Sequence, residues 1–417
     1  MNAATATWGI AALATAGVVI RPWNLSEAIW AVAGALLLVV FGLLPWHDAL
    51  AGVARGLDVY LFLTGMMLLA ELARQEGLFD WLAAKAVRLA KGSASRLFTL
   101  IFAIGTVVTV FLSNDATAVV LTPAVAAVMR AAGVRQPLPY LFICAFIANA
   151  ASFVLPISNP ANLVIYGSHM PPLLLWLPRY ALASALAVAA TYTVLLLTQR
   201  HELQQQLKIE VEIPELSFPA CLTAAGIAAT SIVLLTASAF GMRLGLPTFV
   251  AGAATALVVL WRSANGLRRT VKDITWGVLP LVAGLFVLVE ALEKTGATAE
   301  LTALLTHLVA ISTTLSGWIV GVFLAVACNL VNNLPAGLLA GRVVEAGALT
   351  EQVRAAVLIG VDLGPNLSVT GSLATILWLA ALRREGLAVD AWTFLKLGAV
   401  IMPPALILAL AGALVFP

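Results

Sequence analysis

Four groups of polar residues interrupt the long apolar segments of this sequence, and their side chains are the candidates for chemistry. The groups comprise Ser113, Asn114, Asp115 and Thr117; Asn149, Ser152, Ser158, Asn159 and Asn162; Asn329, Asn332 and Asn333; and Asp362, Asn366, Ser368, Thr370, Ser372 and Thr375. Amide and hydroxyl groups both donate and accept hydrogen bonds. The two carboxyl groups, Asp115 and Asp362, are ionisable groups in apolar surroundings and are candidates for carrying a proton.

Helix breakers accompany these groups. They are Pro156, Pro160, Pro335, Gly364, Pro365 and Gly371. Proline removes a backbone donor and frees a carbonyl, so we expect the surrounding helices to be interrupted. An interrupted helix presents N-terminal amides to ligand oxygens and C-terminal carbonyls to cations. The alternative is that the amides and hydroxyls only join helices, and that each aspartate is a structural ion pair or a helix cap.

The composition places these groups inside a membrane protein. Of the 417 residues, 62% are hydrophobic and 10% are charged, whereas a soluble domain carries about 25% charged residues. Apolar runs of about 16 to 25 residues recur, long enough to cross a hydrocarbon core. They are continuous rather than alternating, which excludes a β-barrel. The first run, "WGIAALATAGVVI", is expected to be a retained span rather than a signal peptide.

Ten apolar segments predict an all-α polytopic protein with about ten transmembrane helices. The segments cover residues 6–20, 27–45, 57–73, 138–167, 173–198, 218–240, 246–262, 274–292, 353–382 and 392–415. Two shorter pieces, 97–112 and 116–130, flank the polar residues 113–115 and predict a re-entrant hairpin, whose tip must face a cavity rather than lipid. The segment 78–92 is amphipathic and is expected to lie in the membrane interface.

The two halves of the chain resemble each other. At a shift of 219 residues, Ser113 and Asn114 match Asn332 and Asn333, Glu71 matches Glu290, Gly65 matches Gly284, and Gly77 matches Gly296. At a shift of 213, Asn149 matches Asp362, Asn159 matches Ser372, and Asn162 matches Thr375. We therefore expect two repeats, residues 1–198 with a hairpin at about 97–130 and residues 218–417 with a hairpin at about 299–341, joined by a hydrophilic linker at 199–217.

The number of spans and the basic residues give an expected orientation. Five crossings in each repeat force the second repeat to be inverted. On that topology, sixteen of the 23 Lys and Arg residues fall on the side that carries 74–96, 130–135 and 262–272. The positive-inside rule makes that side cytoplasmic.

Other residue types give little support for further chemistry. Cys144, Cys221 and Cys328 are scattered, which is typical of buried apolar thiols rather than disulfides. The four histidines make no metal-ligand spacing, and no phosphate-binding loop is present, so we expect no metal, no cofactor and no ATP hydrolysis by the chain itself. Glu71 and Glu290 end their helices near the interfaces, where we expect them to be solvated.

Three stretches resemble a known family. "FLSNDATAVVLTP", "NLVNNLPAGLLAG" and "GVDLGPNLSVTGSLATILWL" are similar to the arsenite and antimonite efflux permeases (ArsB type) of the ion transporter superfamily. The likeness covers about 57–167 and 276 to the C-terminus. The Asp-Leu-Gly-Pro and Gly-Ser-Leu-Ala-Thr motifs are fairly specific to that family, whereas relatives that move dicarboxylates, Na⁺ or other anions share the Ser-Asn-Asp tip.

The resemblance implies two inverted repeats with hairpins, a midplane site at their tips, and export of trivalent metalloids coupled to proton entry. The substrate-binding residues it implies, with the repeat partners added, are Ser113, Asn114, Asn149, Asn159, Asn332, Asn333, Ser372 and Thr375, and the proton-coupling candidates are Asp115 and Asp362. In one departure, many members carry Ser-Asn-Thr at both tips and this second tip reads Asn-Asn-Leu, which disfavours a symmetric pair of Na⁺ sites.

The predicted function is export of arsenite or antimonite, as As(OH)₃ or Sb(OH)₃, across the cytoplasmic (inner) membrane in exchange for protons. Arsenous acid is neutral near pH 7, and three thiolates would hold As(III) too tightly for release. The resemblance allows a separate soluble arsenite-stimulated ATPase as a partner; a homodimer is a further candidate, and no nucleic acid is expected. The alternatives are a Na⁺-coupled dicarboxylate or Na⁺/H⁺ transporter of the same superfamily, a membrane enzyme that uses Asp115 and Asp362 as a catalytic pair, and a receptor.

Overall fold

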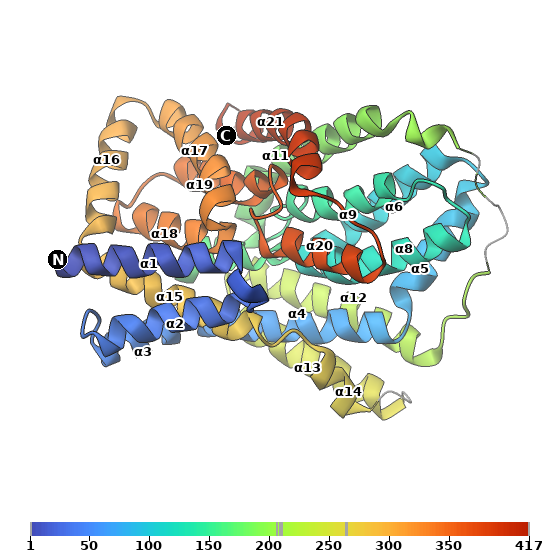
Figure 1. Cartoon of the computed structure of the whole chain (residues 1–417), viewed down its shortest axis with the longest axis horizontal. Coiled ribbons are helices and arrows are strands. Elements are labelled where there is room, and N and C mark those ends of the chain that lie inside the picture. The colour runs from blue at the N-terminus through green and yellow to red at the C-terminus, as the bar shows by residue number, and fades with distance from the viewer. Residues whose placement is uncertain (1, 206, 208–211, 263–265, 416–417) are drawn as a thin grey trace.

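Helices form all the regular structure in the computed structural model, which describes residues 2–205, 207, 212–262 and 266–415 (Figure 1). The first half contains α1 Ala3–Ile20, η1 Pro22–Asn24, α2 Glu27–Val40, α3 Trp46–Arg55, α4 Leu57–Gln75, α5 Leu78–Ala90, α6 Ala94–Phe111, α7 Asn114–Ala116, a π-helical turn η2 Thr117–Leu121, α8 Thr122–Ala131, α9 Leu138–Ala150, η3 Pro156–Ser158, α10 Pro160–Tyr166, η4 Gly167–His169, α11 Leu173–Gln199 and η5 Glu202–Gln204. The second half contains α12 Phe218–Ala239, α13 Gly245–Arg262, α14 Leu267–Asp273, α15 Val278–Lys294, α16 Ala297–Ile311, α17 Thr313–Val331, α18 Asn333–Ala346, α19 Glu351–Leu363, η6 Gly364–Asn366, α20 Leu373–Arg384 and α21 Ala391–Leu414.

The long apolar helices confirm a multi-pass membrane protein. Seven helices of the described residues are long and apolar enough to cross a membrane, or eight if α3 and α4, which meet at 47°, form one span. The ten predicted segments all correspond to helices. Five of them match single helices of that length, α1, α11, α12, α13 and α21, whereas α2 and α15 are shorter and α4 qualifies only together with α3. Two are broken, at 151–159 between α9 and α10 and at 364–372 between α19 and α20. The other two helices of that length, α6 and α17, belong to the predicted hairpins. Pro156, Pro160 and Pro365 lie in or beside these breaks, as expected from the missing backbone donors.

The second half repeats the order of elements of the first. The helices from α1 to α6 correspond to those from α12 to α17, the chain from α7 to α8 corresponds to α18, and α9, α10 and α11 correspond to α19, α20 and α21. The local signals repeat as well. Ser93 and Ser312 cap α6 and α17 at the shift of 219 residues. Gly77 and Gly296 take positive φ angles of 73° and 88° at the matching turns before α5 and α16.

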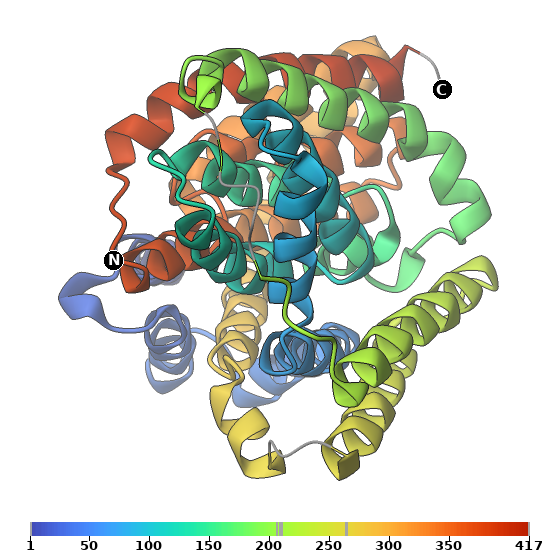
Figure 2. The ribbon, with the colours of Figure 1, turned by 90° about the vertical axis from the view of Figure 1, so that its right-hand side faces the viewer.

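The repeats are interleaved rather than side by side. Helix α13 of the second half packs on α4 of the first, and its counterpart α2 packs on α15 of the second. Figure 2 shows the yellow-green pair α12 and α13 at one edge of the molecule and the blue pair α1 and α2 at another. Glycines permit both crossings: a Cβ on Gly65 would collide with the Thr248 backbone of α13, and one on Gly284 would lie 2.7 Å from the Ala31 backbone of α2.

Two helical hairpins enter from opposite ends of the molecule. Helices α6 and α8 lie toward one end of Figure 1, and α17 and α18 lie toward the other. We infer that these are the hairpins of the two repeats and that the repeats run as 1–198 and 218–417. By element correspondence, the second hairpin spans 313–346 rather than about 299–341. In the predicted linker, residues 206 and 208–211 lie outside the described residues. Helix α5 packs its apolar face on α6 and α8.

The prediction that Glu71 and Glu290 are solvated is wrong. They are only 7% and 5% exposed, respectively, and both carry ion pairs. Arg74 contacts Glu71 at 2.5 Å, and Arg55, at the end of α3, pairs with Glu290. A carboxylate taken from water needs such a partner.

Candidate functional site

The first hairpin tip is built by local caps. The Ser113 hydroxyl accepts from the backbone amide of Ala116 at 3.3 Å and so starts α7. The Asn114 side-chain oxygen accepts from the backbone amide of Asp115 at 2.9 Å. The π-helical turn η2 follows at once, and such turns are frequent at functional sites. This short irregular segment leaves the Asp115 side chain partly exposed in an otherwise buried region.

The second tip is held by the neighbouring broken helix. Asn332 adopts a φ of 71°, and its side chain accepts from the backbone amide of Leu334 at 3.3 Å. The backbone amide of Asn333 donates to the carbonyl of Gly371 at 2.9 Å. The side chain of Asn333 is 3% exposed, and its Oδ1 has no hydrogen-bond partner among the described residues. A buried amide oxygen of this kind is a vacant acceptor.

The two breaks cross each other behind the tips. Asn159 caps α10, accepting from the backbone amide of Ala161 at 2.9 Å, and Ser372 caps α20 in the same way, accepting from that of Thr375 at 3.1 Å. Asn149 accepts from the Ser372 hydroxyl at 3.2 Å, and its amide nitrogen donates to Thr375 Oγ1 at 3.3 Å. The first half therefore positions the break of the second half.

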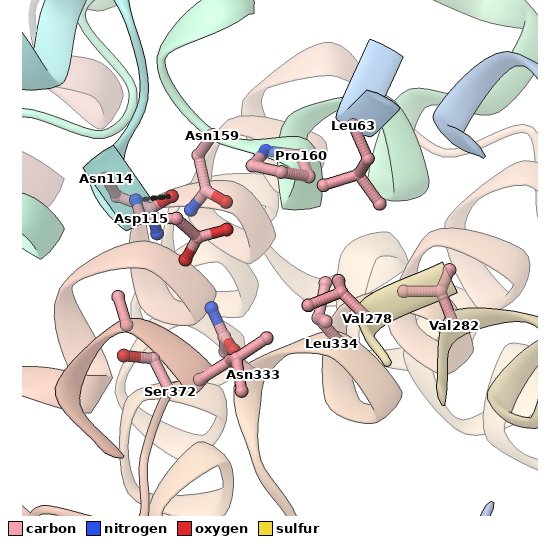
Figure 3. A pocket seen from close by; sticks show the side chains of 12 residues that line it. Leu63, Asn114, Asp115, Asn159, Pro160, Val278, Val282, Asn333, Leu334 and Ser372 are labelled. Atoms are coloured by element: carbon pink, nitrogen blue, oxygen red, sulfur yellow. Dashed lines mark hydrogen bonds between the residues drawn. The ribbon is translucent and has the colours of Figure 1, made fainter. Parts of the chain in front are cut away.

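The tips and the breaks enclose a small inner cavity. Its volume is about 20 Å³, and its lining residues are Leu63, Asn114, Asp115, Asn159, Pro160, Val278, Val282, Asn333, Leu334, Ser372, Leu373 and Ala374. Figure 3 shows Asn114, Asp115 and Asn159 on one side of this cavity and Asn333 and Ser372 on the other. A cavity this small holds about one water molecule, so a larger ligand needs the space beyond it.

The inner cavity adjoins a vestibule of about 470 Å³. Leu63, Asp115, Pro160 and Val278 line both spaces, and Ser113 lines the vestibule. At its other end, the vestibule reaches Arg74, Asp273, Arg384 and Glu385. It therefore connects Asp115 with the end of the molecule that the basic residues predict to be cytoplasmic.

The inner cavity is nearly symmetric. Its matched pairs are Asn114 with Asn333, Asn159 with Ser372, Pro160 with Leu373, Leu63 with Val282, and Asp115 with Leu334. The last pair differs in chemistry, because the residue at the repeat-related position of Asp115 is the apolar Leu334. No Lys or Arg is among the twelve lining residues. Asp115 is thus the ionisable group among these lining residues.

Several predicted residues lie behind the cavities instead of lining them. Asn149, Thr375 and Asp362 are buried at 1%, 1% and 0% exposure, and Asn332 serves as the cap of α18. Cys144 and Cys328 are buried and line neither space, so the structure gives no thiol to the cargo there. Asp115 lines both of these spaces and Asp362 lines neither, which disfavours the two carboxyls as a catalytic pair.

Sequence analysis missed the apolar wall of the inner cavity. Leu63 and Val282 come from α4 and α15, in which the sequence pattern had indicated only the matched glycines and glutamates. The signal was available, because these two residues match at the same shift of 219 as the asparagine tips.

Sequence comparisons find relatives along most of the chain. The arsenical pump membrane protein of Yersinia enterocolitica is 28% identical over 371 residues, 83% of each chain, and that of Escherichia coli (strain K12) is 26% identical over 421 residues, 95% of each chain. The resemblance predicted from the motifs is confirmed.

Solved structures show a similar fold. The YdaH transporter of Alcanivorax borkumensis, described as having an unusual topology, gives a TM-score of 0.55 at 16% identity and covers 89% of this chain and 87% of its own. MtrF of Neisseria gonorrhoeae, described as belonging to a class of antimetabolite efflux pumps, gives 0.55 at 14% identity and covers 100% of this chain and 95% of its own.

A family profile covers most of the chain, since the profile described as citrate transporter matches residues 12–362. The protein is therefore a multi-pass membrane transporter that belongs to the citrate transporter family.

Proposed function

We propose that this transporter exports arsenite and antimonite, as their neutral hydroxides, from the cytoplasm in exchange for protons. The observation that carries the proposal is the polar lining of the inner cavity: one carboxyl, Asp115, among amides and a hydroxyl, with no cation among its lining residues. As(OH)₃ has three hydroxyl groups that donate and accept hydrogen bonds, so Asn333 Oδ1 and the Asp115 carboxylate can each accept one of them.

The same lining disfavours citrate, the substrate in the family's description. A tricarboxylate needs cationic partners in its site. The arginines nearest to the path, Arg74 and Arg384, lie at the far end of the vestibule, and Arg74 is already paired with Glu71 and Asp273. A neutral cargo fits these residues better than a carboxylate does.

Proton exchange follows from competition at Asp115. When the vestibule is open to the cytoplasm, the ionised carboxyl accepts a hydrogen bond from the cargo. On the outer side, that carboxylate oxygen binds a proton and can no longer accept the hydrogen bond, which weakens cargo binding. The proton is then carried back and released, so an inward proton gradient drives outward transport. The relatives named arsenical pumps support the metalloid as cargo.

The test is arsenite flux in proteoliposomes under imposed pH and voltage gradients. We expect wild-type protein to move arsenite against its gradient when protons flow the other way, with no requirement for Na⁺ or for an ATPase. D115N should abolish flux driven by the pH gradient while arsenite counterflow remains. Sodium-dependent dicarboxylate flux from the wild type, with no arsenite flux, would favour the dicarboxylate alternative. Binding of arsenite without counterflow would favour a receptor.

D390N is the matched control for this test. Asp390 is an exposed cap at the start of α21, far in sequence from both tips. The hydroxyl and the amide of Thr393 hydrogen-bond to Asp390 and hold the pKa of its carboxyl below the usual range, so it stays ionised throughout the assay. Asparagine is also a good N-cap, and we expect D390N to transport as the wild type does.

A further inference from the structure

The second aspartate of the predicted site, Asp362, is enclosed by hydrogen-bonding partners. It lies near the end of α19 and is 0% exposed. Asn159 Nδ2 donates to its Oδ1 at 2.9 Å, and Ser152 Oγ lies 2.6 Å from its Oδ2. It lines neither cavity, and no salt bridge joins it to a Lys or Arg in the part of the chain that the structure describes. A carboxyl in this position has no path to solvent through the vestibule.

The contacts of Ser152 indicate that the Asp362 carboxyl is protonated. Its hydroxyl oxygen lies 2.7 Å from the carbonyl oxygen of Asn149 and 2.6 Å from Asp362 Oδ2. A hydroxyl has one proton and cannot donate two short, near-linear hydrogen bonds at once. Both short contacts are satisfied if Asp362 Oδ2 carries a proton and donates it to Ser152, which then donates to Asn149.

The related position in the other half contains an amide. Asn149 matches Asp362 at the shift of 213 residues, and Ser372 matches Asn159. Asn149 Oδ1 accepts from the Ser372 hydroxyl, as Asp362 Oδ1 accepts from the Asn159 amide. In both places a residue of one half holds the cap of the broken helix of the other half. A neutral amide performs this task at Asn149, so the task does not require a charged carboxylate.

The hydrogen bond from Asn159 to Asp362 also fixes the position of Asn159 in the wall of the inner cavity. Asn159 lines that cavity and caps α10 through its Oδ1. Its amide nitrogen carries two protons, of which one is donated to Asp362 and the other is left for a cargo oxygen. We propose that Asp362 keeps its proton through the transport cycle and acts as a positioning residue for Asn159, which leaves Asp115 as the coupling carboxyl. This inference rests on the proposed metalloid/proton exchange.

The surroundings of the two carboxyls fit the assignment of Asp115 to proton coupling and of Asp362 to positioning. The titratable neighbour of Asp362 is the Cys328 thiol of α17, which is itself buried. Asp115 opens on a vestibule whose charged and titratable lining residues are Glu71, Arg74, Asp273, Arg384 and Glu385. Protons can therefore reach Asp115 from water, whereas Asp362 is separated from it.

Substitutions at Asp362 in the full-length protein test the proposal. An asparagine reproduces the protonated carboxyl, since its nitrogen can donate to Ser152 and its oxygen can accept from Asn159. We expect D362N to keep flux driven by the pH gradient, with the wild-type pH profile and a KM for arsenite within about twofold of wild type. D362A removes the hydrogen bond that positions Asn159 and should raise the KM for arsenite about tenfold. Flux in D362A should still respond to the pH gradient. N149A is the matched variant from the other half and should behave as D362A does.

A measurement without arsenite separates this inference from the proposed function. The infrared band of the protonated Asp362 carboxyl, taken as the difference between D115N and the D115N D362N double variant, should keep its intensity from about pH 5 to about pH 9. Loss of this band within that range would overturn the proposal, as would a D362N protein that retains counterflow but no longer responds to the pH gradient. If the wild type moves no arsenite, the proposed function fails and the infrared band alone decides the state of Asp362.

Discussion

Asn333 holds the vacant acceptor of the inner cavity. We predict that N333A raises the KM for arsenite about two- to tenfold, the range of one lost hydrogen bond between neutral groups, and leaves the response to the pH gradient unchanged. Asn2, which caps α1 at the surface, offers the same substitution far in sequence from the tips, and N2A should keep the wild-type KM. An unchanged KM in N333A would remove this residue from the binding site.

The sequence indicated these polar residues because charge and amides are rare in apolar helices. It did not divide them into those that line the cavity and those that lie behind it. Asn149 and Asn159 carry the same side chain ten residues apart, yet one faces the other half's cap and the other faces the cavity. That difference depends on how the two breaks cross, which involves residues more than 200 positions apart.

The close helix crossings at Gly65 and Gly284 support the frame around the site. We predict that G65A and G284A each destabilise the protein by about 1–3 kcal/mol, because the added methyl meets backbone rather than a movable side chain. The midpoint of thermal unfolding in detergent is the measurement. Gly9 of α1 is the control, since a Cβ there meets nothing within 4 Å.

G9A should be neutral or slightly stabilising, because alanine is favoured over glycine by about 1 kcal/mol within a helix. Equal midpoints for G9A and G65A would contradict the crossing described above.

The breaks and the tips were predictable from proline, glycine and polar residues, whereas the ion pair of Glu290 was not. The partner of Glu290 is Arg55, 235 residues earlier, at the end of a separate ten-residue helix, α3. No local pattern joins these positions. The repeat gave the only available signal, because two matched glutamates at equivalent helix ends indicate a shared structural task.

The vestibule makes the molecule asymmetric in the direction of transport. Ala70 lines the vestibule, whereas its repeat counterpart, Val289, is 5% exposed. In a background without Cys144, Cys221 and Cys328, we predict that A70C reacts with a membrane-impermeant thiol reagent added from the cytoplasmic side and that V289C does not. Reaction of A70C only from the outside would reverse the proposed orientation, and equal reaction of both would contradict the open vestibule.

The interleaving of α2 and α13 bears on how the chain is made. When α4 leaves the ribosome, the helix that covers Gly65 has not been synthesised, because α13 begins only at Gly245. The surface of α4 around Gly65 therefore stays uncovered by α13 while the N-terminal half is inserted, and assembly is complete only after most of the polypeptide has entered the bilayer. Two fragments cut within the linker should each be degraded when expressed alone and should rescue one another when produced together.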